Sequence, residues 1–144
     1  MPTVKDLLGM KAPVVYSVRP EDTVFVCLGV LAEHDIGAVL VVGEDGRLEG
    51  IFSERDYARQ VILAGRHSRD LAVSEIMTAE VVGVGPDQTI NQCMAIMTAK
   101  RIRHLPVLEA GQVIGMLSIG DVVKSVIGQK QFEIEQLETY IAQG

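Results

Sequence analysis

The chain has 144 residues, a formal net charge of −6 at neutral pH and 48% apolar residues, few of which are aromatic. This composition suits one compact domain with an aliphatic core, and the acidic balance argues against a nucleic-acid surface, which would carry a basic patch. The longest apolar runs, such as Ala38 to Val42, are far too short to span a membrane, and no basic segment leads into an apolar stretch at the N-terminus. We therefore expect a cytoplasmic protein with neither a membrane nor a nucleic-acid partner.

The first half of the chain predicts a strand, a helix, a hairpin and a second helix. In chain order these are the extended stretch Val14–Val18, a helix that opens at Asp22 or Thr23, the strands Ala38–Val42 and Leu48–Phe52, and a helix that begins at Ser53. Asp and Thr are favoured at helix starts because their side chains accept hydrogen bonds from free backbone N–H groups. Glu44-Asp45-Gly46 has the composition of a hairpin turn, so we expect the two strands to pair directly.

The second half predicts the same four elements in the same order. They are the extended stretch Val81–Val84, a helix that opens at Asp87 or Thr89, the strands Leu105–Leu108 and Val113–Leu117 joined at Ala110-Gly111, and a helix that begins at Ser118. The underlying period is 66 residues and becomes 65 near residue 44. Matched positions include Val15 and Val81, Thr23 and Thr89, Cys27 and Cys93, Gly50 and Gly115, Ser53 and Ser118, and Asp56 and Asp121. The matches fall at turns, helix starts and apolar positions, which indicates one unit made twice.

The C-terminal residues 129–144 are expected to extend the Ser118 helix. Ile134, Leu137 and Ile141 are spaced i, i+3, i+7 and therefore share one helix face. This pattern favours packing against the rest of the chain or against a second chain. A solvated, frayed end is the alternative.

Together these elements predict an α/β (α+β) fold in which two βαββα repeats pack about a pseudo-twofold axis. A single unit of about 50 residues would bury too little apolar surface to be stable alone, and two packed units solve that problem. We expect one module over residues 1–144, with repeats at 10–65 and 77–128 and the helical extension at 129–144.

Three groups of residues resemble the CBS domain (the cystathionine-β-synthase repeat). Gly50–Asp56 and Gly115–Asp121 resemble the Gly-h-h-[Ser/Thr]-x-x-Asp signature that closes such a domain, where h is apolar. Ile102–Val107 resembles the strand before that signature, and Val73–Thr78 resembles the linker that leads into a repeat, with Val4–Leu8 as a looser counterpart. The resemblance covers about residues 4–128 and is closest to small stand-alone bacterial proteins made of a CBS pair, or Bateman module.

The resemblance implies a regulatory nucleotide sensor that is often a disc-like homodimer. Such pairs bind AMP, ADP, ATP, S-adenosylmethionine or NAD between the repeats. The signature Asp holds the ribose hydroxyls with the Ser or Thr beside it, main chain of the opposite repeat recognises adenine, and basic residues approach the phosphates. With no effector domain attached, output would pass through an unidentified effector protein or through oligomerisation.

Carried onto this chain, the resemblance predicts two unequal clefts. One uses Ser53, Arg55, Asp56, Thr78, Val81, Val82, Arg103 and His104, and the other uses Ser118 and Asp121 with Val14, Val15 and Tyr16. Arg is well suited to phosphate oxygens, and Gly120 stands in the second signature where Arg55 stands in the first. We therefore expect a strong nucleotide site in the first cleft. The second would take a less charged ligand, a different nucleotide, or nothing.

Each of these residues also has a purely structural interpretation. Ser-x-x-Asp at a helix start is close to a capping box, which is compatible with ribose binding by Asp56 and Asp121. Arg103 and His104 could instead form a solvated strand end, and Arg55 could pair with Glu54 on the surface. A dimerisation protein whose clefts have lost their ligand is therefore the alternative function.

Catalysis is predicted to be absent. His34, His67 and His104 have no metal-ligand spacing, and the sequence contains neither a nucleophile motif nor a Gly-x-x-x-x-Gly-Lys phosphate loop. A nucleotide-hydrolysing enzyme is thus the weakest hypothesis. Cys27 and Cys93 lie among apolar residues of the two equivalent helices, where free cysteine usually acts as a small buried hydrophobe.

Overall fold

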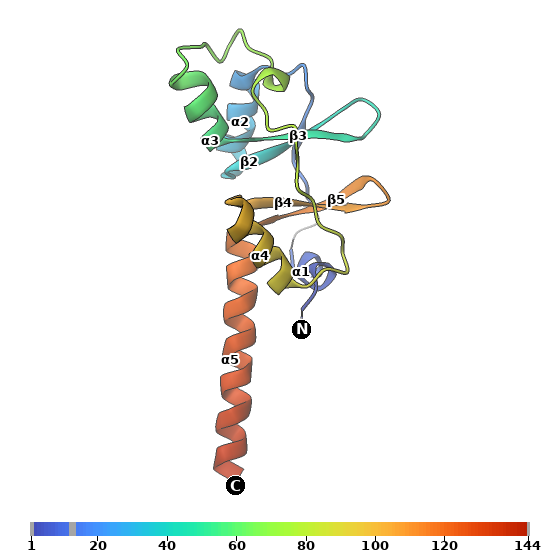
Figure 1. Ribbon diagram of the computed structural model, residues 1–144, viewed down its shortest axis with the longest axis vertical. Coiled ribbons are helices and arrows are strands. Elements are labelled where there is room, and N and C mark those ends of the chain that lie inside the picture. The colour runs from blue at the N-terminus through green and yellow to red at the C-terminus, as the bar shows by residue number, and fades with distance from the viewer. Residues whose placement is uncertain (1, 12–13, 144) are drawn as a thin grey trace. The chain divides into compact units, whose positions relative to one another are not determined.

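The computed structural model describes residues 2–11 and 14–143, and the chain divides into two compact units (Figure 1). The repeat-1 unit contains Val14–Val82 and Glu109–Ile114. The repeat-2 unit contains Met1–Pro13, Gly83–Leu108 and Gly115–Gly144. Each repeat combines helices with a small sheet, so the predicted α/β class and the doubled organisation are confirmed.

The repeat-1 unit is built on a three-stranded sheet in the order β1-β2-β3. Its elements are β1 (Ser17–Val18), α2 (Val24–His34), β2 (Ala38–Val42), β3 (Leu48–Ser53), α3 (Glu54–Tyr57), a π-helical turn (Ala58–Ile62) and a 3-10 turn (Val73–Glu75). β1 runs parallel to β2, and β2 pairs antiparallel with β3. Val24, Cys27 and Leu31 of α2 are buried against Val39 and Phe52 of the sheet in one apolar core.

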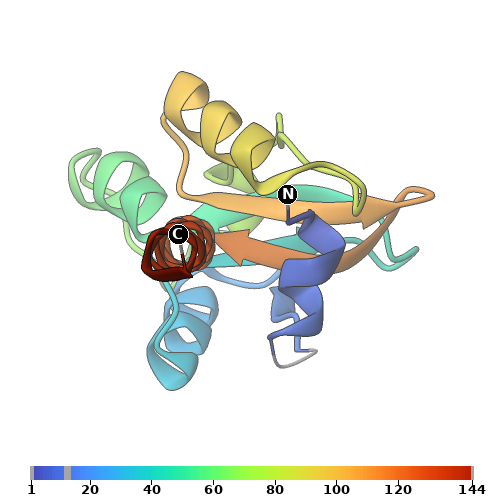
Figure 2. The same ribbon diagram turned by 90° about the horizontal axis from the view of Figure 1, so that it is seen from below.

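The repeat-2 unit holds the remaining helices and most of the β4–β5 hairpin, whose tip, Glu109–Ile114, belongs to the repeat-1 unit. Its elements are α1 (Val4–Gly9), α4 (Ile90–Lys100), β4 (His104–Glu109), β5 (Gln112–Ser118) and α5 (Ile119–Gln143). In Figure 1, α1, α4 and the first turns of α5 lie on one face of the hairpin, and Figure 2 looks onto that face with α5 seen end-on. The rest of α5 continues beyond the other elements of its unit.

The helix starts and hairpin turns fall where they were predicted. Thr23 and Thr89 cap α2 and α4, because each hydroxyl accepts a hydrogen bond from the backbone N–H three residues later. Gly46 and Gly111 close the two hairpins at φ values of 83° and 80°, in the left-handed region that glycine adopts without strain. The predicted continuation of the Ser118 helix through the C-terminal residues is also confirmed, since α5 reaches Gln143.

The strand predicted at Val81–Val84 is wrong. Within the described residues this stretch makes one parallel bridge, from Val84 to Val107, and no strand. Gly83 and Gly85 flank Val84, and glycine weakens a strand because it has no side chain to pack. The matching stretch of the first copy is shortened as well, since β1 has only two residues.

The two cysteines are both fully buried, at 0% exposure, as predicted. Burial raises the pKa of the Cys27 thiol to about 12, and it also raises the pKa of Cys93. Both thiols are therefore protonated near neutral pH and act as small apolar side chains.

The N-terminal segment packs on the second repeat, although it precedes the first. Thr3 forms a backbone bridge with Thr89, the residue that caps α4. A Cβ atom at Gly115 of β5 would lie 2.6 Å from Cδ2 of Leu8, so Leu8 fills the space that a side chain would need. Residues at the very start of the chain thus complete the repeat-2 unit.

The linker of residues 72–78 makes the corresponding arrangement in the repeat-1 unit. Ile51 and Thr78 exchange two backbone hydrogen bonds, of 3.0 and 2.9 Å. A Cβ atom at Gly50 would lie 2.5 Å from Sδ of Met77 and 2.9 Å from the carbonyl oxygen of Thr78. Each signature therefore begins with glycine because a linker segment crosses directly over it.

Candidate functional site

The first candidate site is built on the capping box of α3. The backbone N–H and the hydroxyl of Ser53 donate to Oδ2 of Asp56 at 2.9 and 3.0 Å, and the N–H of Asp56 donates to Oγ of Ser53 at 3.2 Å. The capping interpretation is therefore correct for this pair. The other carboxylate oxygen, Oδ1, accepts a hydrogen bond of 3.2 Å from the exposed hydroxyl of Thr78. The box thus fixes the carboxylate and directs one of its oxygens toward the linker.

The second candidate site repeats this box at the start of α5. The N–H of Ser118 donates to Oδ2 of Asp121 at 2.8 Å, and the N–H of Asp121 donates to Oγ of Ser118 at 3.1 Å. Here the Nζ atom of Lys11 lies 2.6 Å from Oδ2 of Asp121 and also donates to the carbonyl oxygen of Met116 at 2.8 Å. The Asp121 carboxylate is therefore held by a charged donor as well as by its cap.

The pKa of Asp121 reflects this pairing. Burial acts to raise the pKa of the carboxyl, but the hydrogen bonds from Lys11 and Ser118 and the charge of Lys11 outweigh burial and hold the pKa below its ordinary value. The ion pair is only partly exposed, with 33% of the Lys11 side chain and 25% of the Asp121 side chain accessible. It is thus better shielded from water than a typical surface pair.

Lys11 was missed by the sequence reasoning. It follows the segment Val4–Leu8, which was recognised as a loose counterpart of the linker Val73–Thr78. Extending that comparison by a few residues would have brought Lys11 close to a signature Asp. The signal was present, but the N-terminal segment had not been assigned to the second repeat.

The basic residues predicted for the first cleft lie in both units. Arg55 is exposed on the first turn of α3, and Val81 and Val82 are half-buried in the same repeat-1 unit as Asp56. Arg103 is exposed and His104 is half-buried at the start of β4, in the repeat-2 unit. The described contacts therefore bring together Ser53, Asp56 and Thr78.

The main-chain residues predicted for the second cleft lie in the repeat-1 unit, whereas Asp121 lies in the repeat-2 unit. Val14 is exposed and Val15 is half-buried. The Tyr16 ring stacks on His34, with 3.8 Å between ring centroids and 17° between planes. This stacking occupies the Tyr16 side chain.

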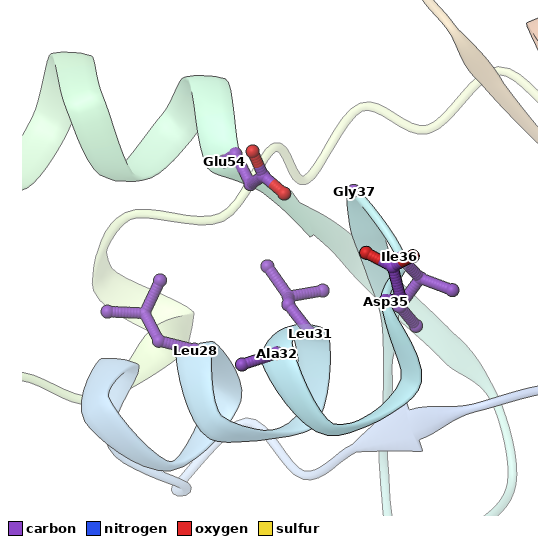
Figure 3. A pocket seen from close by; sticks show the side chains of 7 residues that line it. All are labelled: Leu28, Leu31, Ala32, Asp35, Ile36, Gly37 and Glu54. Carbon is purple, nitrogen blue, oxygen red and sulfur yellow. The ribbon is translucent and has the colours of Figure 1, made fainter.

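A pocket of about 430 Å³ lies in the repeat-1 unit, and none of the predicted site residues lines it, although its lining residue Glu54 stands between Ser53 and Arg55 in the chain (Figure 3). It is lined by Leu28, Leu31, Ala32, Asp35, Ile36, Gly37 and Glu54, between the C-terminal end of α2 and the start of α3. Its polar side chains are two carboxylates, which repel phosphate. This pocket is therefore no candidate for a nucleotide.

Residues 2–11 and 14–143 contain neither a metal-binding cluster nor a membrane-spanning helix. In this part of the chain no group of three or more His, Cys, Asp or Glu side chains is placed to hold a metal ion. None of the described helices is both long and apolar enough to cross a membrane.

Comparisons with known proteins agree with the doubled architecture. The family model for the CBS domain matches the chain twice, at residues 4–62 and 73–128. A mitochondrial CBS domain-containing protein of Arabidopsis thaliana, CBSX3, is 41% identical over 128 residues, which cover 86% of this chain and 62% of that protein. The chain thus spans less than two thirds of this relative. The CBS domain-containing protein YhcV of Bacillus subtilis is 31% identical over 84% of this chain and 83% of its own length.

Solved structures show the same fold. A CBS-domain protein of Burkholderia ambifaria, described as a candidate signal-transduction protein, is 48% identical and superposes with a TM-score of 0.84. The superposition covers 88% of this chain and 94% of that one. At this identity and coverage, the similarity extends to both repeats.

Proposed function

Because this chain belongs to the CBS-domain family and contains a pair of such domains, we propose that it is a non-catalytic regulatory module that binds an adenine nucleotide. CBS domains generally bind such nucleotides. We propose AMP, ADP, ATP or NAD as the ligand, a homodimer as the working form and a cytoplasmic location. Output would then reach a separate effector protein or act through a change of assembly.

The observation that carries this proposal is the environment of Asp56. Its carboxylate is fixed by the cap, and Oδ1 already accepts a hydrogen bond from the Thr78 hydroxyl at 3.2 Å. A ribose hydroxyl is the same kind of neutral donor, so it can replace or join Thr78 without breaking an ion pair. Arg55 follows on the exposed first turn of α3, where its guanidinium suits a phosphate.

We assign the remaining predicted residues to roles around this anchor. Val81 and Val82 would contribute main chain to the adenine, and Arg103 and His104 would approach the phosphates from the other repeat. The second site would use Asp121 with Val14, Val15 and Tyr16. Lys11 makes this second site weaker, because a ribose hydroxyl must compete there with a charged donor.

The proposal is tested by titrating the full chain with AMP, ADP, ATP and NAD in a calorimeter, for the wild type and for Asp56→Asn. We expect the variant to weaken binding of the preferred nucleotide at least tenfold, which is about 1.4 kcal/mol. Asn keeps the size of Asp but loses the charge that strengthens both ribose hydrogen bonds.

The matched control is Asp6→Asn, because Thr3 and Asp6 form the same type of capping box at α1. This variant should lose similar capping strength and keep wild-type affinity. Full affinity in Asp56→Asn would overturn the site assignment. If none of the four nucleotides binds to the wild type, the nucleotide proposal itself fails.

One observation favours the alternative function, a dimerisation protein without a ligand. The C-terminal half of α5 exposes several large apolar side chains, which suit contact with another chain. Stable assembly together with no response to any adenine nucleotide would favour this alternative.

A further inference from the structure

The C-terminal part of α5 exposes an ordered row of large aliphatic side chains. Ile127, Ile134, Leu137 and Ile141 are 64%, 48%, 62% and 73% exposed, and Val123 begins the row at 39%. From Gln131 to Gln143 every described residue of α5 is exposed. Figure 1 shows this part of the helix continuing beyond α4 and α1 of its own unit. Among the described residues of its own unit, no element covers this row.

The spacing of this row is that of a coiled-coil seam. Positions 123, 127, 130, 134, 137 and 141 alternate in steps of four and three residues and are occupied by Val123, Ile127, Lys130, Ile134, Leu137 and Ile141. Five of the six are aliphatic, which matches the a and d positions of consecutive heptads. A stripe only two positions wide per heptad suits one partner helix better than a sheet or a broad groove.

The charges of α5 identify the partner and its direction. Beyond Asp121, which is paired with Lys11, the first half of the helix carries Lys124 and Lys130. The second half carries only acidic charges, namely Glu133, Glu135 and Glu138. A second α5 running antiparallel brings each basic half against an acidic half, whereas a parallel copy stacks like charges. The opposed helix dipoles favour the same direction.

We propose that α5 binds the α5 helix of a second copy of this chain as an antiparallel two-stranded coiled coil. Placing Ile134 opposite Lys130 of the second copy sets the register. Ile127 then lies opposite Leu137 of the second copy, and Val123 lies opposite Ile141. Every layer of the seam thus contains at least one aliphatic side chain, which is the condition for a continuous apolar interface.

The antiparallel arrangement also accommodates Lys130, the one charged residue among the six seam positions. In a parallel dimer it would face its own copy in the middle of the seam. In the antiparallel register its aliphatic stem lies against Ile134 of the second copy, and its ammonium group reaches the interface edge. Within one chain, Oε2 of Glu133 lies 3.5 Å from Nζ of Lys130. In the dimer, Glu133 of each copy lies at this same edge of the interface. Two lysines and two glutamates then alternate at the centre of the dimer.

The contact is tested first by the mass of the full chain in solution, measured by light scattering after size-exclusion chromatography. Leu137→Glu places a charge in the seam and should halve the mass of the wild-type assembly. Phe132→Glu is the matched control, because Phe132 is 61% exposed on the same helix but lies outside the seam. Both residues are exposed, so neither substitution disturbs the fold of one chain. Nucleotide affinity should be unchanged in both, which separates this test from that of the proposed function.

The direction is tested by crosslinking, and the two buried native cysteines leave the engineered ones as the reactive thiols. In the antiparallel register, a mixture of Ile127→Cys and Leu137→Cys chains should crosslink efficiently, and each variant alone should not. Self-crosslinking of each single variant, with no crosslink between the two different variants in the mixture, would replace the antiparallel arrangement by a parallel one. A monomeric wild type, or a Leu137→Glu protein that keeps the wild-type mass, would overturn the proposal altogether.

Discussion

The two repeats share one helix cap and differ in the side chain that closes over it. Ser53 with Asp56 and Ser118 with Asp121 form the same box at the same point of the fold. Asp56 then meets the hydroxyl of Thr78, whereas Asp121 meets the ammonium group of Lys11. The cap is the same in both repeats. The segments that precede the repeats supply the group that bonds to the capping carboxylate, a hydroxyl in one case and an ammonium group in the other.

This difference gives two copies of one cap different hydrogen-bond partners. A neutral hydroxyl at 3.2 Å is exchanged easily for another hydroxyl, while a charged donor at 2.6 Å forms a stronger bond. A few linker residues therefore set the partner of each carboxylate without disturbing either core.

The largest expected difference between the repeats concerns the glycine under each linker. Gly50→Ala should destabilise the protein by about 2 kcal/mol, because the new Cβ would meet the carbonyl oxygen of Thr78 at 2.9 Å as well as Met77. Gly115→Ala should cost less than about 1 kcal/mol, because there the Cβ meets only the flexible end of Leu8. The entropic gain of replacing glycine is the same in both variants and leaves the difference intact.

Urea unfolding of the two variants beside the wild type measures these costs. Equal losses in the free energy of unfolding would mean that the backbone at Thr78 moves aside as easily as the Leu8 side chain, and that the two glycines are equivalent. A larger loss for Gly115→Ala would reverse the comparison.

Much of this comparison could be predicted from the sequence, because it rests on local patterns. The Thr23 and Thr89 caps and the hairpins each depend on residues close together in the chain, and the doubling is the recurrence of these local patterns after 65 or 66 residues. Ser53 and Asp56 are three residues apart, so their box was also predictable. The contact of Lys11 with Asp121 was not, because it joins residues that are 110 positions apart. No local pattern tells which repeat a linker covers.

Removing the ammonium group of Lys11, the charged donor to Asp121, should make the two sites more alike. Lys11→Met keeps most of the aliphatic stem of Lys11 but frees Asp121 from the ammonium group. Competition by a charge-assisted hydrogen bond costs a ligand roughly 1 to 2 kcal/mol, so the affinity of the second site should rise about tenfold. Native mass spectrometry of the full chain with added nucleotide should then show two bound ligands per chain instead of one.

The control for this variant is Lys5→Met, which removes an exposed lysine from α1. It should leave the number of bound nucleotides at one. If Lys11→Met also binds a single nucleotide, Lys11 is not what weakens the second site. If it binds none, Lys11 contributes to the ligand site rather than competing with it.

The smallest expected effect is the pH dependence that Asp121 gives to the stability. Its pKa is lowered in the folded protein, so the unfolded state binds more protons between the folded pKa and the ordinary value of about 3.9. The stabilisation is thus complete above the ordinary value and is lost as the pH falls through the folded pKa. Since the pair is partly exposed, we expect a contribution of less than about 1 kcal/mol.

Urea unfolding between pH 6 and pH 3 should show the free-energy difference between the wild type and Asp121→Asn shrinking as the pH falls. Asp6 titrates in the same window, because its hydrogen bonds with Thr3 also lower its pKa, but it is present in both proteins and cancels in the difference. Asp45→Asn, at an exposed position, corrects for the loss of one charge. A difference that stays constant with pH would mean that the ion pair with Lys11 does not stabilise the fold, and that Lys11 is free to act on a ligand.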